Sequence, residues 1–405
     1  MMTYGYKPEL SEGAIKCPIF QTSTFVFRTA EEGKAFFEVA YGKREKLPNE
    51  ELGLIYSRIN NPDLEILENR LCLWDGADDC AVFESGMSAI TTVLLEFLKP
   101  GDLIAHSAPL YGGTDHFIQH FLPSIGVHTV GFLPGSTEDE IADRIEATGH
   151  ADRLALVYLE TPANPTNDLI DIAACRSVAD RFAQGDDRAL VCVDNTYMGP
   201  LWQHPLKHGA DLVVYSATKY IGGHSDIIAG AVLGHAEPMA RIKTLRTFLG
   251  NMAGPWTGWL MMRSLETLKV RMERQQHNAE IIARHLRDHP KVGAVNHLSL
   301  LDEGSPEHDI WQRQCKGTGA MLSFHVKGGE REAFAFLNNL KLMKLAVSLG
   351  STESLAQHPR SMTHAGVAEE HLDELGVSDS LVRLSIGVED PIDLIYDIDK
   401  ALAGI

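Results

Sequence analysis

Short apolar runs alternate with helix-forming stretches from about residue 80 to about residue 230, and this alternation limits the fold more than any other feature. The apolar runs lie at 80–83, 103–105, 127–132, 154–159, 189–193 and 211–215, and helical patterns between them include 86–98, 137–147 and 171–183. A continuous apolar run is typical of a strand buried on both faces, and parallel strands need a crossover between them. We therefore predict an α/β fold with a mainly parallel sheet and helices on both faces.

The sequence on either side of this segment predicts two further parts. Residues 1–60 form an extended arm with a short helix at 30–41 and a charged, exposed loop at 42–53, before a helix that ends at Asp75-Gly76. From Gly254 onward we expect one long helix with apolar positions from Met261 to Leu286, then strands at 321–326, 343–347 and 381–386 and helices at 331–340 and 390–403. The predicted domains are an N-terminal arm (1–60), a cofactor-binding domain (61–253) and a smaller α+β domain (254–405).

Charge and cysteine content limit the possible partners. The formal net charge of −19 disfavours nucleic acid and anionic membranes as partners. The six cysteines show no metal-site spacing, so we expect reduced thiols and no metal. Neither a signal peptide nor an apolar run of about 18 residues is evident. We therefore expect a cytoplasmic protein.

Asp194 and Lys219 stand at the ends of two predicted neighbouring strands. The carboxyl ends of parallel strands face the ligand crevice, so both side chains are predicted at one pocket. Burial favours a neutral amine, which is the form that makes a Schiff base with an aldehyde cofactor. A nearby aspartate suits the ring nitrogen of pyridoxal phosphate (PLP), and the hydroxyls of Ser216 and Thr218 suit its phosphate. The alternative is a surface lysine beside an unrelated aspartate.

Four other places in the chain carry candidate site residues. The turn at 84–88 between a strand and a helix presents backbone N–H groups to an anion, although such a turn also serves packing alone. Tyr111 follows a strand beside two glycines, where an aromatic ring can lie over another ring. Asn164 is held between two prolines. Arg383 lies within an apolar strand and needs an anionic partner, either a substrate carboxylate or an acidic residue of this chain.

Together these stretches resemble the PLP-dependent transsulfuration family, the enzymes of cysteine and methionine metabolism. The resemblance runs from about residue 10 to the end of the chain. The motifs that carry it, in order, are YSRINNP, ESGMSAI, LYGGT, ETPANPT, VDNT, SATKYIGGHSD, AVSLGSTESLAQHP, MTHA and VRLSIGVED.

The resemblance implies the PLP-dependent transferase fold (fold type I), with a mainly parallel sheet of seven strands. It implies that Lys219 carries PLP, Asp194 binds the ring nitrogen and Tyr111 stacks on the ring and protonates the leaving group. It also implies phosphate contacts from Gly86, Met87, Ser216 and Thr218, and substrate-carboxylate contacts from Asn164, Ser348 and Arg383. Tyr56 and Arg58 are implied to reach the phosphate of a neighbouring subunit in a homotetramer made of two catalytic dimers.

The implied activity is γ-elimination from a γ-substituted L-amino acid, resembling methionine, homocysteine or canavanine, to a 2-oxo acid and ammonia. The stretch from AVSLG to MTHA looks most like methionine γ-lyases, and Val347 stands where cystathionine γ-lyases commonly carry glutamate. Gly113 replaces the reactive cysteine of typical methionine γ-lyases, and Ser225 is the form common in cystathionine enzymes. Two alternatives therefore stay open: a γ-replacement transferase, and a PLP-binding protein without activity.

Two features depart from the family pattern. The charged loop at 42–53 is longer than in methionine lyases, and Trp256 replaces a smaller residue near the predicted domain boundary. One interpretation is an altered pocket for a polar γ-substituent, such as the guanidino-oxy group of canavanine. The other is neutral drift on the surface.

Overall fold

The computed structural model describes residues 2–48, 50, 52–185, 188–367 and 369–405. A seven-stranded sheet forms its centre, in the order β1-β7-β6-β5-β4-β2-β3. These strands are β1 (Asp79–Phe83), β2 (Leu103–Ser107), β3 (His128–Phe132), β4 (Leu154–Glu160), β5 (Leu190–Asp194), β6 (Leu212–Ser216) and β7 (Gly230–Gly234). Neighbours from β6 to β3 are parallel, whereas β7 is antiparallel to both β6 and β1. The prediction of a mainly parallel α/β sheet is confirmed.

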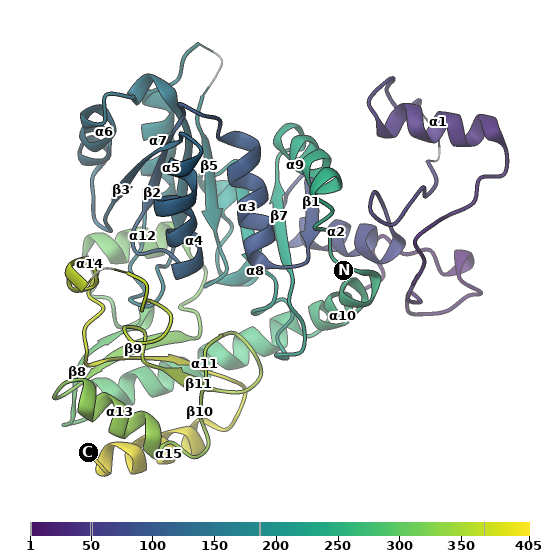
Figure 1. Cartoon of the computed structure of the whole chain (residues 1–405). Helices are drawn as coiled ribbons and strands as arrows, with labels where there is room; N and C mark the ends of the chain where they lie inside the picture. Colours follow the sequence, from purple (N-terminus) through teal and green to yellow (C-terminus); the bar gives the residue numbers. More distant parts are fainter. Residues whose placement is uncertain (1, 49, 51, 186–187, 368) are drawn as a thin grey trace.

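Helices cover both faces of this sheet (Figure 1). They are α2 (Pro62–Asp75), α3 (Gly86–Phe97), α4 (Gly112–His116), α5 (Leu122–Ser124), α6 (Glu138–Ala147), α7 (Ile172–Arg181), α8 (Gly199–Trp202) and α9 (Ala236–Leu249). Successive residues of one strand enter different apolar clusters: Leu212 and Val214 pack with α3 and α9, whereas Val213 and Tyr215 pack with α2. Alternating side chains of a strand point to opposite faces, so both faces of β6 are buried, as its uninterrupted apolar run predicts.

The C-terminal part holds a second, smaller sheet in the order β10-β11-β12-β9-β8. Its strands are β8 (Val292–Asn296), β9 (Met321–Val326), β10 (Lys344–Leu345), β11 (Leu355–Gln357) and β12 (Leu381–Ser385). Its helices are α10 (Pro255–Leu265), α11 (Leu268–Arg287), α12 (Pro306–Gln314), α13 (Glu330–Asn339), α14 (Glu369–Glu374) and α15 (Pro391–Ala403). The smaller α+β part is therefore confirmed.

The prediction of a single long helix from Met261 to Leu286 is wrong, because α10 ends at Leu265 and α11 begins at Leu268. The chain tightens between them, where the N–H of Thr267 donates to the carbonyl of Ser264. Apolar residues continue on both sides of this break, so the pattern alone did not reveal it. The predicted strand at 343–347 is also shorter, with only Lys344 and Leu345 paired to β11.

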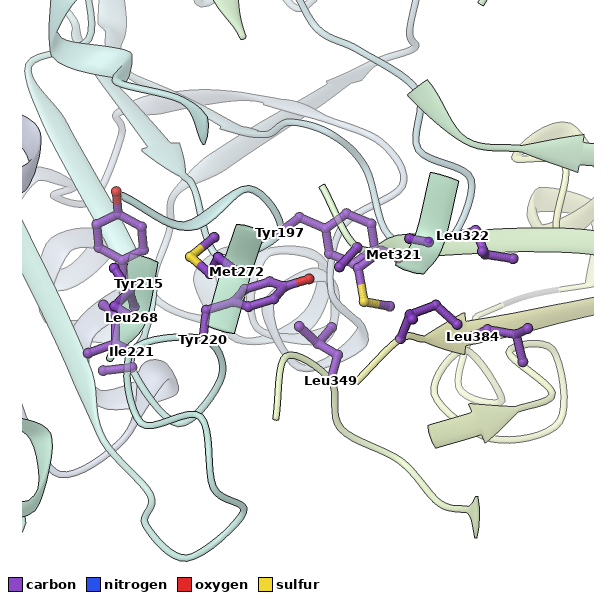
Figure 2. Packing of buried hydrophobic residues seen from close by; sticks show 14 of the residues in the cluster. Tyr197, Tyr215, Tyr220, Ile221, Leu268, Met272, Met321, Leu322, Leu349 and Leu384 are labelled. Carbon is purple, nitrogen blue, oxygen red and sulfur yellow. The ribbon is translucent and has the colours of Figure 1, made fainter. Parts of the chain in front are cut away.

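One apolar cluster joins the two sheets into a common core. Figure 2 shows Tyr215 and Tyr220, from the end of the large sheet, in the same packed region as Met321 and Leu384 of the small sheet. Met272 of α11 and Leu349 lie between them. This packing fixes the segment that follows β6 against the C-terminal part.

The start of the chain packs on the body of the molecule, where Cys17 is buried and Tyr6 and Phe20 lie against the main apolar cluster. The segment that carries α1 (Ala30–Ala40) projects away from the body (Figure 1). Phe27, Phe36 and Phe37 make edge-to-face ring contacts there. The described residues of the 42–53 loop are mostly exposed, and Arg44 binds the carboxylate of Glu50 through both terminal nitrogens at 2.8 and 2.6 Å. Asn49 and Glu51 of this loop lie outside the described residues.

Candidate active site

A cavity of about 260 Å³ lies at the carboxyl ends of β4, β5 and β6. Eight of the residues predicted from sequence line it: Gly86, Met87, Tyr111, Asn164, Asp194, Ser216, Thr218 and Lys219. Carboxyl ends of parallel strands are the usual position of ligands in open α/β sheets. The structure therefore brings most of the predicted site residues to one hollow.

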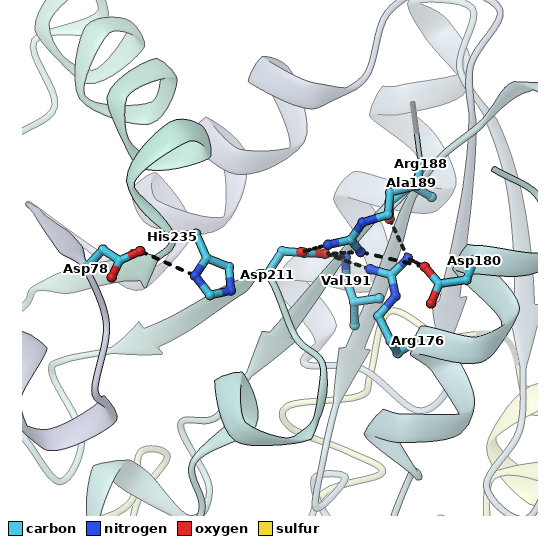
Figure 3. A network of polar contacts seen from close by, with 8 residues as sticks. All are labelled: Asp78, Arg176, Asp180, Arg188, Ala189, Val191, Asp211 and His235. Atoms are coloured by element: carbon cyan, nitrogen blue, oxygen red, sulfur yellow. Dashed lines mark hydrogen bonds and ion pairs between the residues drawn. The ribbon is translucent and has the colours of Figure 1, made fainter. Parts of the chain in front are cut away.

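Three larger hollows, of about 580, 640 and 390 Å³, lie elsewhere. The first lies at the amino ends of the parallel strands, opposite the cavity. There Arg176 and Arg188 bind the carboxylate of Asp211 at 2.9 and 2.7 Å (Figure 3). The second lies between α9 and the segments around α1 and Arg58. In Figure 3 the charge of Asp211 is already paired with both arginines, so we assign the chemistry to the smaller cavity, which collects the predicted site residues.

Lys219 stands in the turn that follows β6. Its Nζ donates a hydrogen bond to Oγ of Ser348 at 2.9 Å. Burial, together with the charge of Arg383, lowers the pKa of Lys219 to about 8. At neutral pH a larger share of this amine is therefore neutral than of an ordinary lysine, whose pKa is about 10.4.

Asp194 is the last residue of β5 and is 5% exposed. Its Oδ1 accepts the N–H of Thr196 at 3.0 Å and its Oδ2 accepts the hydroxyl of Tyr158 at 3.4 Å. Burial raises the pKa of this carboxyl group. No cationic side chain among the described residues forms an ion pair with it, so this buried carboxylate fits a cationic group that the chain does not supply.

The first turn of α3 approaches the end of β6 unusually closely. A Cβ atom on Gly86 would lie 2.9 Å from Cβ of Ser216, so only glycine fits there. Oγ of Ser85 accepts the N–H of Ser88 at 3.0 Å and thereby caps the helix. The remaining N–H groups of this first turn have no partner within the helix, which suits an anion such as a phosphate.

The hydroxyl of Thr218 is already engaged within the chain. Its Oγ1 donates to the carbonyl of Ala229 at 3.2 Å and accepts the N–H of Ala229 at 3.0 Å. The proton of this hydroxyl is therefore used, and a phosphate contact from it requires this hydrogen bond to change. Ser216 is fixed through its N–H, which donates to Oγ1 of Thr196 at 2.8 Å.

Tyr111 precedes α4 and is 44% exposed, so its ring is accessible at the mouth of the cavity. Its backbone N–H donates to Oε2 of Glu160 at 2.7 Å. A Cβ atom at Gly113 would lie 2.8 Å from the Tyr111 ring and 3.2 Å from the sulfur of Met87. A side chain at position 113 would therefore displace the tyrosine ring, which glycine leaves undisturbed.

Arg383 lies in the middle of β12 and is 3% exposed. Its two terminal nitrogens donate to Oδ1 of Asn164 at 3.1 Å and to the carbonyl oxygen of Ser348 at 2.6 Å. Its Nε is buried without a hydrogen-bond partner, and no described carboxylate forms an ion pair with this guanidinium. The alternative of an acidic partner from this chain therefore finds no support, and the group suits a ligand carboxylate.

Ser348 connects these groups, because its side chain contacts Lys219 and its carbonyl contacts Arg383. Its φ of 98° lies in the left-handed region that non-glycine residues rarely adopt. Backbone strain of about 1–3 kcal/mol at such positions is common at functional sites.

Tyr56 and Arg58 lie outside this cavity. Tyr56 is 40% exposed, and a terminal nitrogen of Arg58 donates to the carbonyl of Thr247 at 2.7 Å. Both belong to the arm at 1–60, and Arg58 lines the hollow beside α9. The structure therefore does not bring them to the site of their own chain.

Sequence reasoning missed three polar residues of the cavity: Glu160, Thr196 and Tyr197. Glu160 ends β4 as Asp194 ends β5, and the two are paired in the sheet register. The rule that identified Asp194, a polar residue that closes an apolar run, therefore applied equally to Glu160. Thr196 and Tyr197 lie two and three residues after Asp194; Thr196 belongs to the VDNT motif, but no role was predicted for either residue.

These residues together offer a nucleophilic amine, an unpaired buried carboxylate, a helix N-terminus for an anion and a buried arginine for a carboxylate. Neither this cavity nor any other group of described residues collects three or more metal-ligating side chains. None of the described helices combines the length and the apolar character that are needed to cross a bilayer.

Comparisons with known proteins bear on this chemistry. The family described as Cys/Met metabolism PLP-dependent enzyme matches residues 1–403. An L-methionine gamma-lyase from Fusobacterium nucleatum subsp. polymorphum is 40% identical, over 97% of this chain and 94% of that protein. The cystathionine gamma-lyase from Homo sapiens is 39% identical, over 89% of this chain and 86% of that protein.

Solved structures of similar proteins share the whole fold. The crystal structure of metB from Corynebacterium glutamicum has a TM-score of 0.86 at 35% identity and covers 99% of this chain and 96% of its own. The cystathionine gamma synthase from Xanthomonas oryzae pv. oryzae, in complex with cystathionine, has a TM-score of 0.85 at 34% identity, with coverage of 99% and 96%.

Proposed function

This chain belongs to the Cys/Met metabolism PLP-dependent enzymes, and from that premise we propose that it is a lyase. The proposed reaction is γ-elimination from a γ-substituted L-amino acid, such as methionine, homocysteine or canavanine, to a 2-oxo acid and ammonia. The similarity to methionine and cystathionine gamma-lyases over most of the chain supports it. The observation that carries the proposal is the partly buried Lys219 amine beside the unpaired Asp194 and Arg383.

The residues of the cavity fit PLP. The N-terminus of α3 suits its phosphate, Asp194 suits its protonated ring nitrogen, and the Tyr111 ring is free to stack on it. When bound, PLP supplies an aldehyde that combines with amino groups and a ring that accepts electrons. The unpaired charge of Asp194 supports this assignment most directly, since a buried carboxylate without a cation is costly.

The other groups of the site handle the substrate and its protons. Arg383, with Asn164 and Ser348, is proposed to bind the α-carboxylate, which fixes the Cα–H bond relative to Lys219. The Lys219 amine then removes the proton from Cα as a general base. The Tyr111 hydroxyl is proposed to donate a proton to the γ-substituent as it leaves.

Three residues near the site bear on which substrate is used. Val347 is 58% exposed and carries no charge to attract a second amino group. The Tyr111 ring and the sulfur of Met87 lie close to Gly113, where a Cβ atom would stand, so position 113 adds no side chain to the cavity. Ser225 donates a hydrogen bond to Oγ of Ser351 at 2.9 Å and contacts Glu353, and it does not line the cavity. These features favour a substrate with one amino acid end and a compact γ-substituent.

A γ-replacement transferase is the second candidate. The similarity of the fold to a cystathionine gamma synthase favours it, as does the serine at position 225. The same groups would serve both reactions up to loss of the γ-substituent. In γ-replacement a thiol then forms a new bond to Cγ of the remaining unsaturated amino acid, whereas in γ-elimination water releases it as a 2-oxo acid and ammonia.

We also propose a cytoplasmic homotetramer made of two catalytic dimers. The six free cysteines support a reducing compartment, and the exposed Tyr56 supports a contact with a neighbouring subunit. In this proposal Tyr56 and Arg58 reach the phosphate in the neighbouring cavity. The proposed domains are the arm at 1–60, the PLP-binding domain at 61–253 and the C-terminal domain at 254–405.

A substrate screen tests the proposed function. The PLP-loaded protein is incubated with L-methionine, L-homocysteine, L-canavanine, cystathionine and O-acylhomoserines, and both 2-oxo acid and ammonia are measured. Release of both in equal amounts without an added thiol is the expected result. Product formation only when an O-acylhomoserine and a thiol are both present would identify a transferase, and bound PLP with no turnover would identify an inactive protein.

The pKa of Lys219 predicts how PLP capture depends on pH. Only the neutral amine attacks an aldehyde, and about 9% is neutral at pH 7 for a pKa of about 8, against about 0.04% for an ordinary lysine. We expect the rate of PLP capture by the apoprotein to rise with pH and to reach half of its maximum near pH 8. Stopped-flow absorbance at several pH values measures this rate, and a midpoint near pH 10 would contradict the prediction.

A further inference from the structure

Glu160 occupies the centre of the site without an assigned role. It ends β4, is 6% exposed and lines the cavity. Its backbone N–H donates to Oγ of Ser107 at 3.0 Å, which ties its main chain to the end of β2. Its side chain lies beside Asp194, because the two residues are paired in the register of β4 and β5.

The side chain of Glu160 holds two separate loops. Its Oε2 accepts the backbone N–H of Tyr111 at 2.7 Å, and its Oε1 accepts the backbone N–H of Asn164 at 3.3 Å. Tyr111 presents the ring at the mouth of the cavity, and Oδ1 of Asn164 accepts a hydrogen bond from Arg383. One carboxyl group therefore touches the backbone of both loops.

Burying the ionised carboxyl group of Glu160 costs free energy. Burial and the neighbouring charge of Asp194 raise its pKa, and no described lysine, arginine or histidine forms an ion pair with it. A glutamine would fill the same volume without burying a second negative charge. However, an amide has a single acceptor oxygen, and its NH₂ group would face the other N–H. The two N–H groups stabilise the ionised form of Glu160 and partly offset the rise in its pKa. Accepting both N–H groups at once is thus the property that the ionised glutamate has and glutamine lacks.

We propose that Glu160 is a positioning residue that sets the place of the Tyr111 ring and the place of Asn164 together. Through Tyr111 it orients the ring that faces PLP, and through Asn164 it orients the arginine that binds the substrate carboxylate. This inference rests on the proposed function, because it assigns PLP and a carboxylate to the two ends of the cavity.

The two hydrogen bonds differ in length, and this predicts different effects for two substitutions. In Glu160→Gln the amide oxygen is expected to keep the shorter hydrogen bond, from the N–H of Tyr111, and to lose the hydrogen bond from the N–H of Asn164. The KM for the amino acid then rises about tenfold or more, while the Kd of the apoprotein for PLP changes less than about threefold. Glu160→Ala loses both contacts, so both constants rise about tenfold or more.

The control is Asp75→Asn, which changes another buried carboxyl group. Asp75 is 2% exposed, accepts the Tyr215 hydroxyl at 2.8 and 3.0 Å, and does not line the cavity. We expect its substitution to lower the thermal unfolding temperature and to leave KM and the PLP Kd within about twofold of wild type. A purely structural role for Glu160 would give the same pattern in its own variants.

The experiment measures KM, the PLP Kd by fluorescence titration of the apoprotein, and binding of glycine to the loaded protein by absorbance. Glycine carries the carboxylate and has no γ-substituent, so its affinity is measured even if no amino acid is turned over. A wild type that binds PLP and glycine without turnover would refute the proposed function alone. Glu160→Gln with unchanged glycine affinity and unchanged KM would refute the positioning role. So would a Glu160→Gln variant in which KM and the PLP Kd rise by the same factor.

Discussion

Replacing Lys219 with alanine is expected to lower kcat/KM for every γ-substituted amino acid by about 10⁴-fold or more. The Nζ atom lies in the cavity within hydrogen-bond reach of Ser348, and its pKa of about 8 suits both covalent capture of an aldehyde and proton removal. A general base alone contributes about 10²- to 10⁴-fold, and this substitution also removes the covalent attachment point. Steady-state assays and the absorbance of the PLP-loaded protein measure both losses.

The same substitution tests whether the lysine is functional or merely buried. Because the folded pKa lies below the unfolded value of about 10.4, the unfolded chain binds more protons between about pH 8 and 10.4, and the free energy of unfolding of the apoprotein rises with pH there. Lys219→Ala is expected to lack this increment, which urea titrations at pH 7.5 and 10 would measure. The control is Lys291→Ala, whose Nζ contacts the carbonyl of Leu402 at 2.8 Å in the C-terminal part. Retention of more than about 1% of kcat/KM would contradict the role of Lys219.

The large sheet was predictable because most of its strands are continuous apolar runs in the sequence. Buried parallel strands need apolar side chains on both faces, so β4, β5 and β6 are continuous apolar runs. The strand β7 has only five residues, two of them glycine, and was not predicted. A Cβ atom at Gly230 would lie 2.1 Å from the carbonyl oxygen of Ser85, so glycine is needed there for the close approach of α3. Because glycine has no apolar side chain, β7 does not stand out as an apolar run.

The site was predictable only in part for a different reason. Residues at the ends of predicted neighbouring strands, such as Asp194 and Lys219, can be brought together by sheet geometry alone. The contact between Lys219 and Ser348 spans 129 positions, and that between Asn164 and Arg383 spans 219. No periodicity or spacing encodes such contacts. The family resemblance placed Asn164, Ser348 and Arg383 together at the substrate carboxylate, but it did not predict the contact between Lys219 and Ser348.

The energetics of the cavity favour a ligand over the free protein. Three ionisable groups of the cavity have pKa values shifted toward the neutral form by burial: the partly buried Lys219 and the buried Asp194 and Glu160. Burial also lowers the pKa of Arg383, and its Nε has no hydrogen-bond partner. Each shift means that folding has placed a charge where it is poorly solvated. A ligand that carries a cationic ring nitrogen and a carboxylate relieves two of these costs, so binding is coupled to stability and should raise the unfolding temperature.

Arg383→Lys is expected to lower kcat/KM by about 10²- to 10³-fold, mainly through KM. The planar guanidinium donates to Asn164 and Ser348 and still has Nε free, whereas an ammonium group cannot match this fork. The charge of Arg383 also lowers the pKa of Lys219, so the neutral variant Arg383→Ala is expected to shift the pH profile of PLP capture upward from about 8, while Arg383→Lys leaves it nearly in place. Arg246→Lys, at another buried arginine that binds Glu68 at 2.6 Å outside the cavity, is the matched control and should lower stability without changing KM. An Arg383→Lys variant with wild-type KM, or an Arg383→Ala variant with an unshifted profile, would show that this guanidinium neither binds the substrate carboxylate nor acts on the lysine.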